Sequence, residues 1–230
     1  MHAAGRAGLN AYNGVVDQHG RWTGRVNLAG SRLELPLRWK KPRLIFVNSM
    51  SDLFHQNAAG YVARVFGGMA RAPQRTDLVL TKHPDFMGER LKRQPAWPHV
   101  WLGASIEDDY ARRQRARYLY DLSGEGWNTF VSAESLLGPL DLSGMLPWLP
   151  WVIVGGESGP RARWCRVEWV EDVVDQCQAA GVPVFVKQLG SNHGVPGVHH
   201  AHGGDPAEWP EALRVREFPD FTARRAGPWR

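Results

Sequence analysis

The sequence predicts an α/β fold with a parallel sheet, either an open barrel or a doubly wound sheet, and three observations predict it. Short apolar runs recur after Pro42, and their starts lie roughly 20 to 35 residues apart. The segments between them carry apolar residues at helical spacing, and strands that alternate with helices favour parallel pairing. The runs are continuously apolar, which indicates strands buried on both faces.

Six strands are expected from these runs, at residues 44–47, 77–81, 100–106, 129–133, 151–156 and 182–188. A helix is predicted within residues 57–73, because Tyr61, Val65 and Met69 lie on one face and Pro73 ends the pattern. A second helix is predicted within residues 166–183. Its apolar stripe stops at Gly181, where a left-handed C-cap suits glycine.

The two ends of the chain differ from the middle. Residues 1–40 show little periodicity and are expected to wrap the surface as loops with one short element. Residues 41–190 hold the strands, and residues 191–230 begin with a loop rich in Gly, Pro and His. Asp205 and Pro206 suit the N-cap and first residue of a short helix that runs through Leu213.

Composition limits the function classes. No apolar run approaches the roughly 20 residues that cross a bilayer, and the first residues do not resemble a signal peptide, so a cytoplasmic setting is expected. Cys165 and Cys177 suggest neither a disulfide framework nor a zinc ribbon. Four irregularly spaced histidines between residues 193 and 202 are interpreted as a loop, so no metal is predicted.

The formal net charge of +5 can favour polyanions through counterion release. One helix would carry Arg112, Arg113, Arg115 and Arg117, which makes nucleic acid a possible partner. The alternative is that these arginines cover a solvated helix face. Both interpretations remain open at this point.

Every expected strand ends in polar or charged residues. In parallel α/β folds ligands bind at the carboxyl ends of the strands, so these side chains are expected to line one basin. The ligand-pocket candidates are Asn48, Ser51, Asp52, Thr81, Lys82, Ser105, Glu107, Ser132, Glu134, Gly155, Gly156, Glu157 and Lys187.

Three of these carboxylates would face two amines. Glu107, Glu134 and Glu157 with Lys82 and Lys187 would form a charge network, which either serves a ligand or closes the top of the sheet with structural ion pairs. Gly155 and Gly156 would let the backbone approach a ligand closely. The catalytic residues and the substrate are left open.

Six longer motifs together resemble a known family. They are PLRWKKPRLIFVNSMSDLFH, LTKHPDFM, VWLGASIED, VSAESLLGPLDL, WVIVGGESGPRAR and QCQAAGVPVFVKQLG. They resemble the phage Gp thirty-seven/sixty-eight family, uncharacterised phage and bacterial proteins related to radical S-adenosylmethionine (SAM) enzymes, from about residue 12 to about 220. A phage-encoded protein would act in the cytoplasm of a bacterial host.

The resemblance implies that residues 41–190 form a partial (β/α) barrel of about six strands, with the first βα unit missing. Ser51 and Asp52 match a motif near the SAM amino group, and Thr81 and Lys82 match a Thr-Lys motif. The remaining pocket positions that the resemblance implies are Ser105, Glu107, Ser132, Glu134 and residues 155–157.

The sequence departs from the family pattern in its cysteines. Full-length relatives hold SAM and a [4Fe-4S] cluster through an early cysteine-rich loop, whereas this chain has no cysteine before Cys165. Three thiolates leave one iron free for SAM, so no cofactor and no radical chemistry are expected of the chain as written. Either the start was misplaced or the chain is a truncated relative, and the strand at residues 44–47 would then be an apolar edge.

Two function classes follow. The first is a radical-SAM-like enzyme of unknown substrate in the full-length form. The second is a cluster-free binding module for SAM, a nucleotide, nucleic acid or a partner protein.

Overall fold

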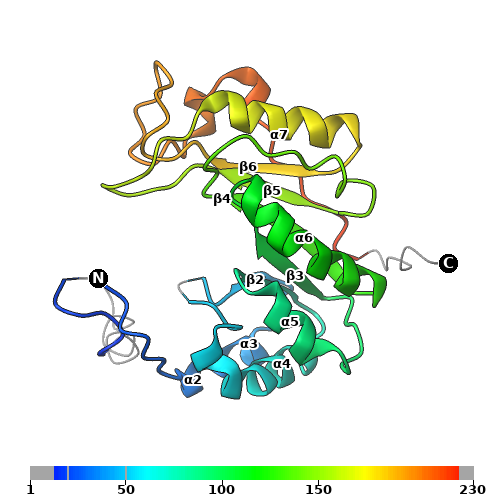
Figure 1. Cartoon of the computed structure of the whole chain (residues 1–230). Helices are drawn as coiled ribbons and strands as arrows, with labels where there is room; N and C mark the ends of the chain where they lie inside the picture. The colour runs from blue at the N-terminus through cyan, green and yellow to red at the C-terminus, as the bar shows by residue number, and fades with distance from the viewer. Residues whose placement is uncertain (1–12, 20, 50, 223–230) are drawn as a thin grey trace.

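The computed structural model describes residues 13–19, 21–49 and 51–222. Six parallel strands form one sheet in the order in which they follow along the chain. They are β1 (Leu44–Val47), β2 (Thr76–Thr81), β3 (Val100–Ser105), β4 (Asn128–Glu134), β5 (Val152–Gly155) and β6 (Val184–Gln188). The sheet curls into a half-barrel (Figure 1). The predicted α/β class and partial barrel are confirmed.

Helices connect most of the strands on the convex side. A 3-10 helix, η1 (Gln56–Tyr61), and α4 (Val62–Ala70) link β1 to β2, and α5 (Pro84–Leu91) links β2 to β3. The two longest described helices are α6 (Asp109–Gly124) and α7 (Val167–Ala179). The α7 stripe buries Val170, Val173, Val174 and Cys177, and Gly181 follows with φ +65°, as the sequence predicted.

The strand register separates two faces of the sheet. Leu102 pairs laterally with Val79 and Thr129, and this row faces the helices on the convex side. Trp101 pairs with Leu78, and this row faces the concave side. Because side chains alternate along a strand, each later residue of a strand can be assigned to one of the two faces.

Aromatic rings fill the lower part of the concave face. Trp101, Phe130 and Trp151 are buried there, and Phe221 packs against Trp101 with ring centroids 5.1 Å apart. A Cβ on Gly103 would lie 2.3 Å from the Phe130 ring, so glycine lets that ring lie directly on the sheet. The half-barrel therefore has a packed floor made of side chains from the sheet and from the C-terminal segment.

The two edges of the sheet differ. Residues 215–217 cover β6, because Val186 N–H donates to the Val215 carbonyl over 2.9 Å and Glu217 N–H donates to the Val184 carbonyl over 2.9 Å. At the other edge, β1 leaves Leu44 44% and Phe46 42% exposed. The apolar edge predicted for residues 44–47 is confirmed.

Two predictions about the ends need correction. The predicted helix from Pro206 through Leu213 is two 3-10 segments, η2 (Pro206–Glu208) and η3 (Glu211–Leu213). Pro210 lies between them, and a proline without an N–H group interrupts an α-helix. Asp205 does cap η2, since it accepts a hydrogen bond from Ala207 N–H over 3.0 Å.

The N-terminal region holds more structure than the one short element predicted. Two short helices, α2 (Gly30–Leu33) and α3 (Leu35–Arg38), follow each other, with Pro36 in the first turn of α3. An isolated antiparallel bridge joins Val16 and Trp22. Residues 1–12 of the predicted wrapping segment lie outside the described residues. No helix within the described ranges is long and apolar enough to cross a membrane.

Candidate ligand site at the strand ends

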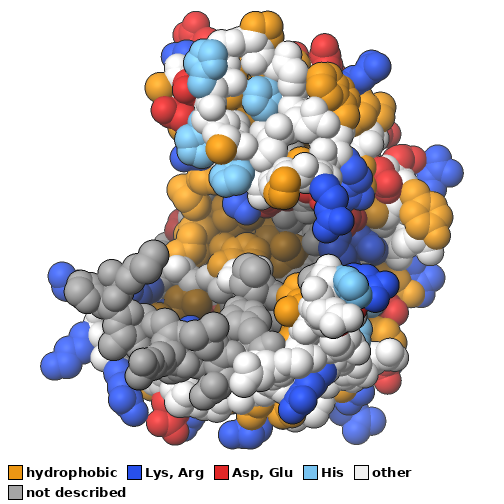
Figure 2. Space-filling view, turned by 90° about the vertical axis from the view of Figure 1, so that its left-hand side faces the viewer, with side chains coloured by type: hydrophobic (Ala, Val, Ile, Leu, Met, Phe, Trp, Pro, Cys, Tyr) orange, Lys and Arg blue, Asp and Glu red, His pale blue; other side chains and the backbone are white. Residues whose placement is uncertain are grey.

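The predicted site residues gather where the strands end. Figure 2 shows a hollow on one side of the molecule, with hydrophobic side chains on its floor and Lys and Arg side chains at its border. The concave rows of the sheet continue upward from the aromatic floor into Ser105 on β3, then Ser132 and Glu134 on β4. The strand ends thus form a polar rim above an apolar floor.

Asp52 connects the loop after β1 to the end of β2 through hydrogen bonds. Its carboxylate accepts hydrogen bonds from the Thr81 hydroxyl over 2.7 Å, from Lys82 N–H over 2.9 Å and from Phe54 N–H over 2.9 Å. Asn48, with φ +56°, donates from its side chain to the Ser51 hydroxyl within the same loop. These contacts hold the loop beside β2, so Asp52 has a structural role.

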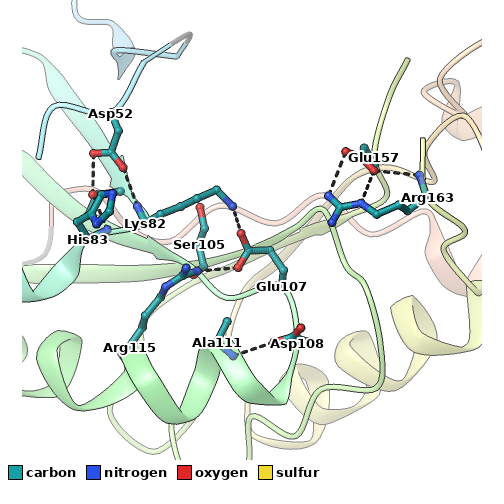
Figure 3. Close-up of polar contacts among 11 residues, drawn as sticks. Asp52, Lys82, His83, Ser105, Glu107, Asp108, Ala111, Arg115, Glu157 and Arg163 are labelled. Atoms are coloured by element: carbon teal, nitrogen blue, oxygen red, sulfur yellow. Dashed lines mark hydrogen bonds and ion pairs between the residues drawn. The ribbon is translucent and has the colours of Figure 1, made fainter. Parts of the chain in front are cut away.

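Glu107 lies at the centre of a charged trio. One carboxylate oxygen forms an ion pair with Lys82 Nζ, from the end of β2. The other accepts a hydrogen bond from Arg115 Nη1 of α6 over 2.7 Å. The same Arg115 nitrogen also donates to the Ser105 carbonyl over 2.6 Å. In Figure 3 Ser105 lies between the Lys82 side chain and the Arg115 guanidinium. Two cations share one buried carboxylate, which leaves one positive charge uncompensated within the trio.

Lys82 is perturbed by this environment. Burial lowers the pKa of Lys82, and the neighbouring Arg115 and Arg163 guanidinium groups lower it further. Asp52 and Glu157 oppose that effect. Burial likewise lowers the pKa of Arg115. Arg115 and Arg163 therefore lie close enough to Lys82 to disfavour its charged form.

Two serines on neighbouring strands face the same hollow. Ser105 and Ser132 are lateral partners in the register of β3 and β4, and they are 4% and 2% exposed. Neither hydroxyl makes a hydrogen bond within the described part of the chain. Their oxygens are not among the fully enclosed atoms without a partner, so solvent or a ligand in the hollow can reach both hydroxyls.

A second ion pair spans the sheet beyond the serines. Lys187 Nζ on β6 contacts both oxygens of Glu134 on β4, at 2.7 and 3.0 Å. Because β5 lies between these two strands, the pair crosses over the end of β5. Lys82 and Lys187 therefore hold opposite sides of the rim, with the two serines between them in the strand order.

Glu157 forms a third pair with Arg163, which lies on the loop after β5. The carboxylate accepts from Arg163 Nε over 2.7 Å, from Nη2 over 3.0 Å and from the Arg163 backbone N–H over 2.9 Å. These hydrogen bonds lower the pKa of Glu157. The predicted network of three carboxylates and two amines is thus divided into one trio and two pairs, in which Arg115 and Arg163 supply the additional cations.

Gly155 and Gly156 have a packing role. A Cβ on Gly155 would lie 2.7 Å from the Gln188 carbonyl oxygen, and one on Gly156 would lie 2.1 Å from the Leu189 carbonyl oxygen. Both glycines therefore let the end of β5 approach the chain after β6. This contact accounts for both glycines without a ligand.

Arg115 and Arg163 are the site residues that sequence reasoning missed. The sequence groups Arg115 with three other arginines of one helix. In the structure its side chain lies on the side of α6 that faces β3. Arg112 and Arg113 share Asp109, at 2.6 and 3.0 Å, so much of that row is internally paired. Arg163 lies six residues after Glu157 in the quoted motif, and that proximity was the available signal.

The thiols do not fit an iron–sulfur cluster. The chain has two cysteines, and both are buried. Burial raises the pKa of Cys165 to about 11 and that of Cys177 to about 12, so both stay protonated at neutral pH. A cluster with one free iron needs three thiolates. Among the residues that the structure describes, no group of three or more His, Cys, Asp or Glu side chains is placed to hold a metal ion.

The comparisons with known proteins give one result. No curated protein and no solved structure matches the chain. A family model described as "Protein of unknown function (DUF5131)" matches residues 3–211, which is most of the sequence. The chain therefore belongs to the DUF5131 family.

Proposed function

We propose that this protein is a cluster-free relative of the phage Gp thirty-seven/sixty-eight and radical SAM proteins, and that it binds an adenosine-type small molecule, SAM or a nucleotide, on its concave face. The observation that carries the proposal is the meeting of a polar rim and an apolar floor at the ends of six parallel strands. Ligand sites in α/β folds form at this edge, and they combine apolar walls with a few convergent polar groups.

The chain's own residues supply complementary groups. Partly buried Leu80 and exposed Phe46 on the concave side offer apolar contact to an uncharged ring. Glu107 and Glu134 can accept hydrogen bonds from hydroxyl or amino groups, and Lys82 and Lys187 can bind anionic groups. Each charged side chain is held by its partner, which limits the loss of side-chain entropy when a ligand binds.

The same donor set argues against radical chemistry in this chain. SAM is cleaved reductively by an iron–sulfur cluster, and two buried thiols do not hold one. The proposed activity is therefore binding.

Isothermal titration calorimetry with SAM, AMP and adenosine tests the proposal. We expect saturable binding of at least one of them by the wild type and weaker binding by Glu134→Gln, which keeps the shape of the side chain but removes its charge. Glu168→Gln, an exposed glutamate in the first turn of α7, is the matched control and should bind like the wild type. Failure of all three compounds to bind would contradict the proposal.

A further inference from the structure

We infer that the Ser105 and Ser132 hydroxyls, flanked by Lys82 and Lys187, form a subsite for a phosphoryl group. This inference rests on the proposed function and deepens it, because it selects a nucleotide over SAM as the class of ligand. Three features support the subsite: the unpartnered hydroxyls, their position between two ammonium groups, and the cations that surround Glu107.

The first feature is the pair of hydroxyls on Ser105 and Ser132. Their residues are more than nine-tenths buried, yet neither hydroxyl has a partner among residues 13–19, 21–49 and 51–222. Both lie on the concave row above Trp101 and Phe130, so they face the hollow and not the helices. Neighbouring strands lie about 4.8 Å apart, which lets two hydroxyls donate to two oxygens of one tetrahedral anion.

The second feature is the pair of flanking ammonium groups, Lys82 and Lys187. Lys82 follows β2 on one side of the serines, and Lys187 lies on β6 on the other. Both side chains are about half exposed, at 56% and 51%, so a ligand in the hollow can reach each ammonium while its carboxylate partner holds it. An ammonium on a flexible stem is a common phosphate ligand in proteins.

The third feature is the arrangement of charges around Lys82 and Glu107. Lys82 and Arg115 both contact the carboxylate of Glu107, and Asp52 also favours the charged form of both cations. Burial is the main cause of the lowered pKa of Lys82, and repulsion by Arg115 and Arg163 lowers it further. A bound dianion would relieve that repulsion and raise the pKa of Lys82. The methionyl group of SAM brings a cationic sulfonium and a zwitterion, which relieve the repulsion at Lys82 less than a dianion does.

The experiment compares AMP with adenosine on the wild-type protein and on the double variant Ser105→Ala/Ser132→Ala. Isothermal titration calorimetry gives the affinities, and inorganic phosphate is added as a competitor. We expect AMP to bind at least about tenfold more tightly than adenosine, in line with hydrogen bonds to a charged group. The double variant should lose this preference and keep its affinity for adenosine.

Two further variants keep the test decisive. Ser123→Ala, near the C-terminal end of α6, is the matched control and should bind AMP like the wild type. Lys187→Gln changes a half-exposed residue and should weaken AMP without weakening adenosine, even if the double variant does not fold. Equal affinity for AMP and adenosine in the wild type would overturn the subsite, as would unchanged AMP binding in a folded double variant.

The outcomes separate the subsite from the proposed function. If adenosine and SAM bind and AMP shows no advantage, the concave site stands and the phosphoryl subsite fails. If neither adenosine nor SAM binds while inorganic phosphate binds in a serine-dependent manner, the subsite stands and the adenosine-type ligand fails. Phosphate binding measured by ³¹P relaxation distinguishes these cases directly.

Discussion

The convex and concave faces of the same sheet are built differently. On the convex face Val79, Leu102 and Val131 are fully buried beneath the helices. On the concave face the floor is closed by Phe218 and Phe221, while Phe46 stays exposed and the Ser105 and Ser132 hydroxyls stay unpartnered. The helices close the convex face, whereas the concave face leaves one exposed ring and two hydroxyls open toward the hollow. That difference is why we propose the ligand site on the concave face.

The largest effect is expected where β5 meets the chain after β6. Gly156→Ala would place a Cβ 2.1 Å from the Leu189 carbonyl oxygen, a backbone atom that cannot move without breaking the contact. We expect a loss of about 4 kcal/mol or more in the free energy of unfolding, or failure to fold. Gly159→Ala on the next loop has open space but φ +114°, so it separates backbone strain from this steric clash. Urea unfolding of both variants measures the difference.

The next prediction compares the two faces directly. Leu102→Ala removes a fully buried convex side chain and should cost about 2 to 5 kcal/mol. Phe46→Ala, at an exposed concave position, should cost less than about 1 kcal/mol. Equal losses in urea titrations would show that both faces contribute equally to stability, against this interpretation.

The pH dependence tests a buried polar group on the convex side. Asp77 is 4% exposed, and burial raises the pKa of its carboxyl from 3.8 to about 6, with Arg75 partly opposing the effect. Folding therefore favours the protonated form. Its stabilising effect is complete below pH 3.8 and is lost as the pH rises through 6. The limit of that loss is about 3 kcal/mol.

Asp77→Asn removes this titration while it keeps the shape of the side chain. The variant should gain stability relative to the wild type as the pH rises from 4.5 to 8, and urea unfolding at both values measures the gain. A constant difference between the two proteins across that range would rule out Asp77 as the titrating group.

The smallest effect on stability is expected at the rim. Lys187→Gln breaks the ion pair with Glu134, but the lysine is half exposed, so the cost should stay below about 1 kcal/mol. A thermal melt that loses more than a few degrees would place Lys187 in the structural part of the molecule. That result would remove the distinction between a rim for ligands and a core for stability.

The fold was predictable because its signals are local. The apolar runs at residues 44–47 and 77–81 became β1 and part of β2, and the valine stripe before Gly181 became α7. The helix expected through Leu213 is interrupted because Pro210 has no N–H group to continue it, although Asp205 caps its start. Local capping signals predict where a helix begins better than how far it extends.

The site was predictable in position and less so in pairing. Parallel strands have their carboxyl ends at one edge of the sheet, which predicts that Lys82, Glu107 and Glu134 lie along that edge. Arg115 comes from the outer helix and reaches over the strand end, and only the three-dimensional rotation of α6 shows it. Whether the Ser105 hydroxyl has a partner also depends on every neighbouring atom, which no sequence pattern reports.

The central claim is that a ligand sits on the concave rim, and amide chemical shifts measured while AMP is added test it most directly. The account predicts shifts concentrated at Lys82, Ser105, Ser132 and Lys187, with the convex helix residues Leu119 and Val173 unchanged. Shifts spread over the convex helices, or none at saturating AMP, would contradict it.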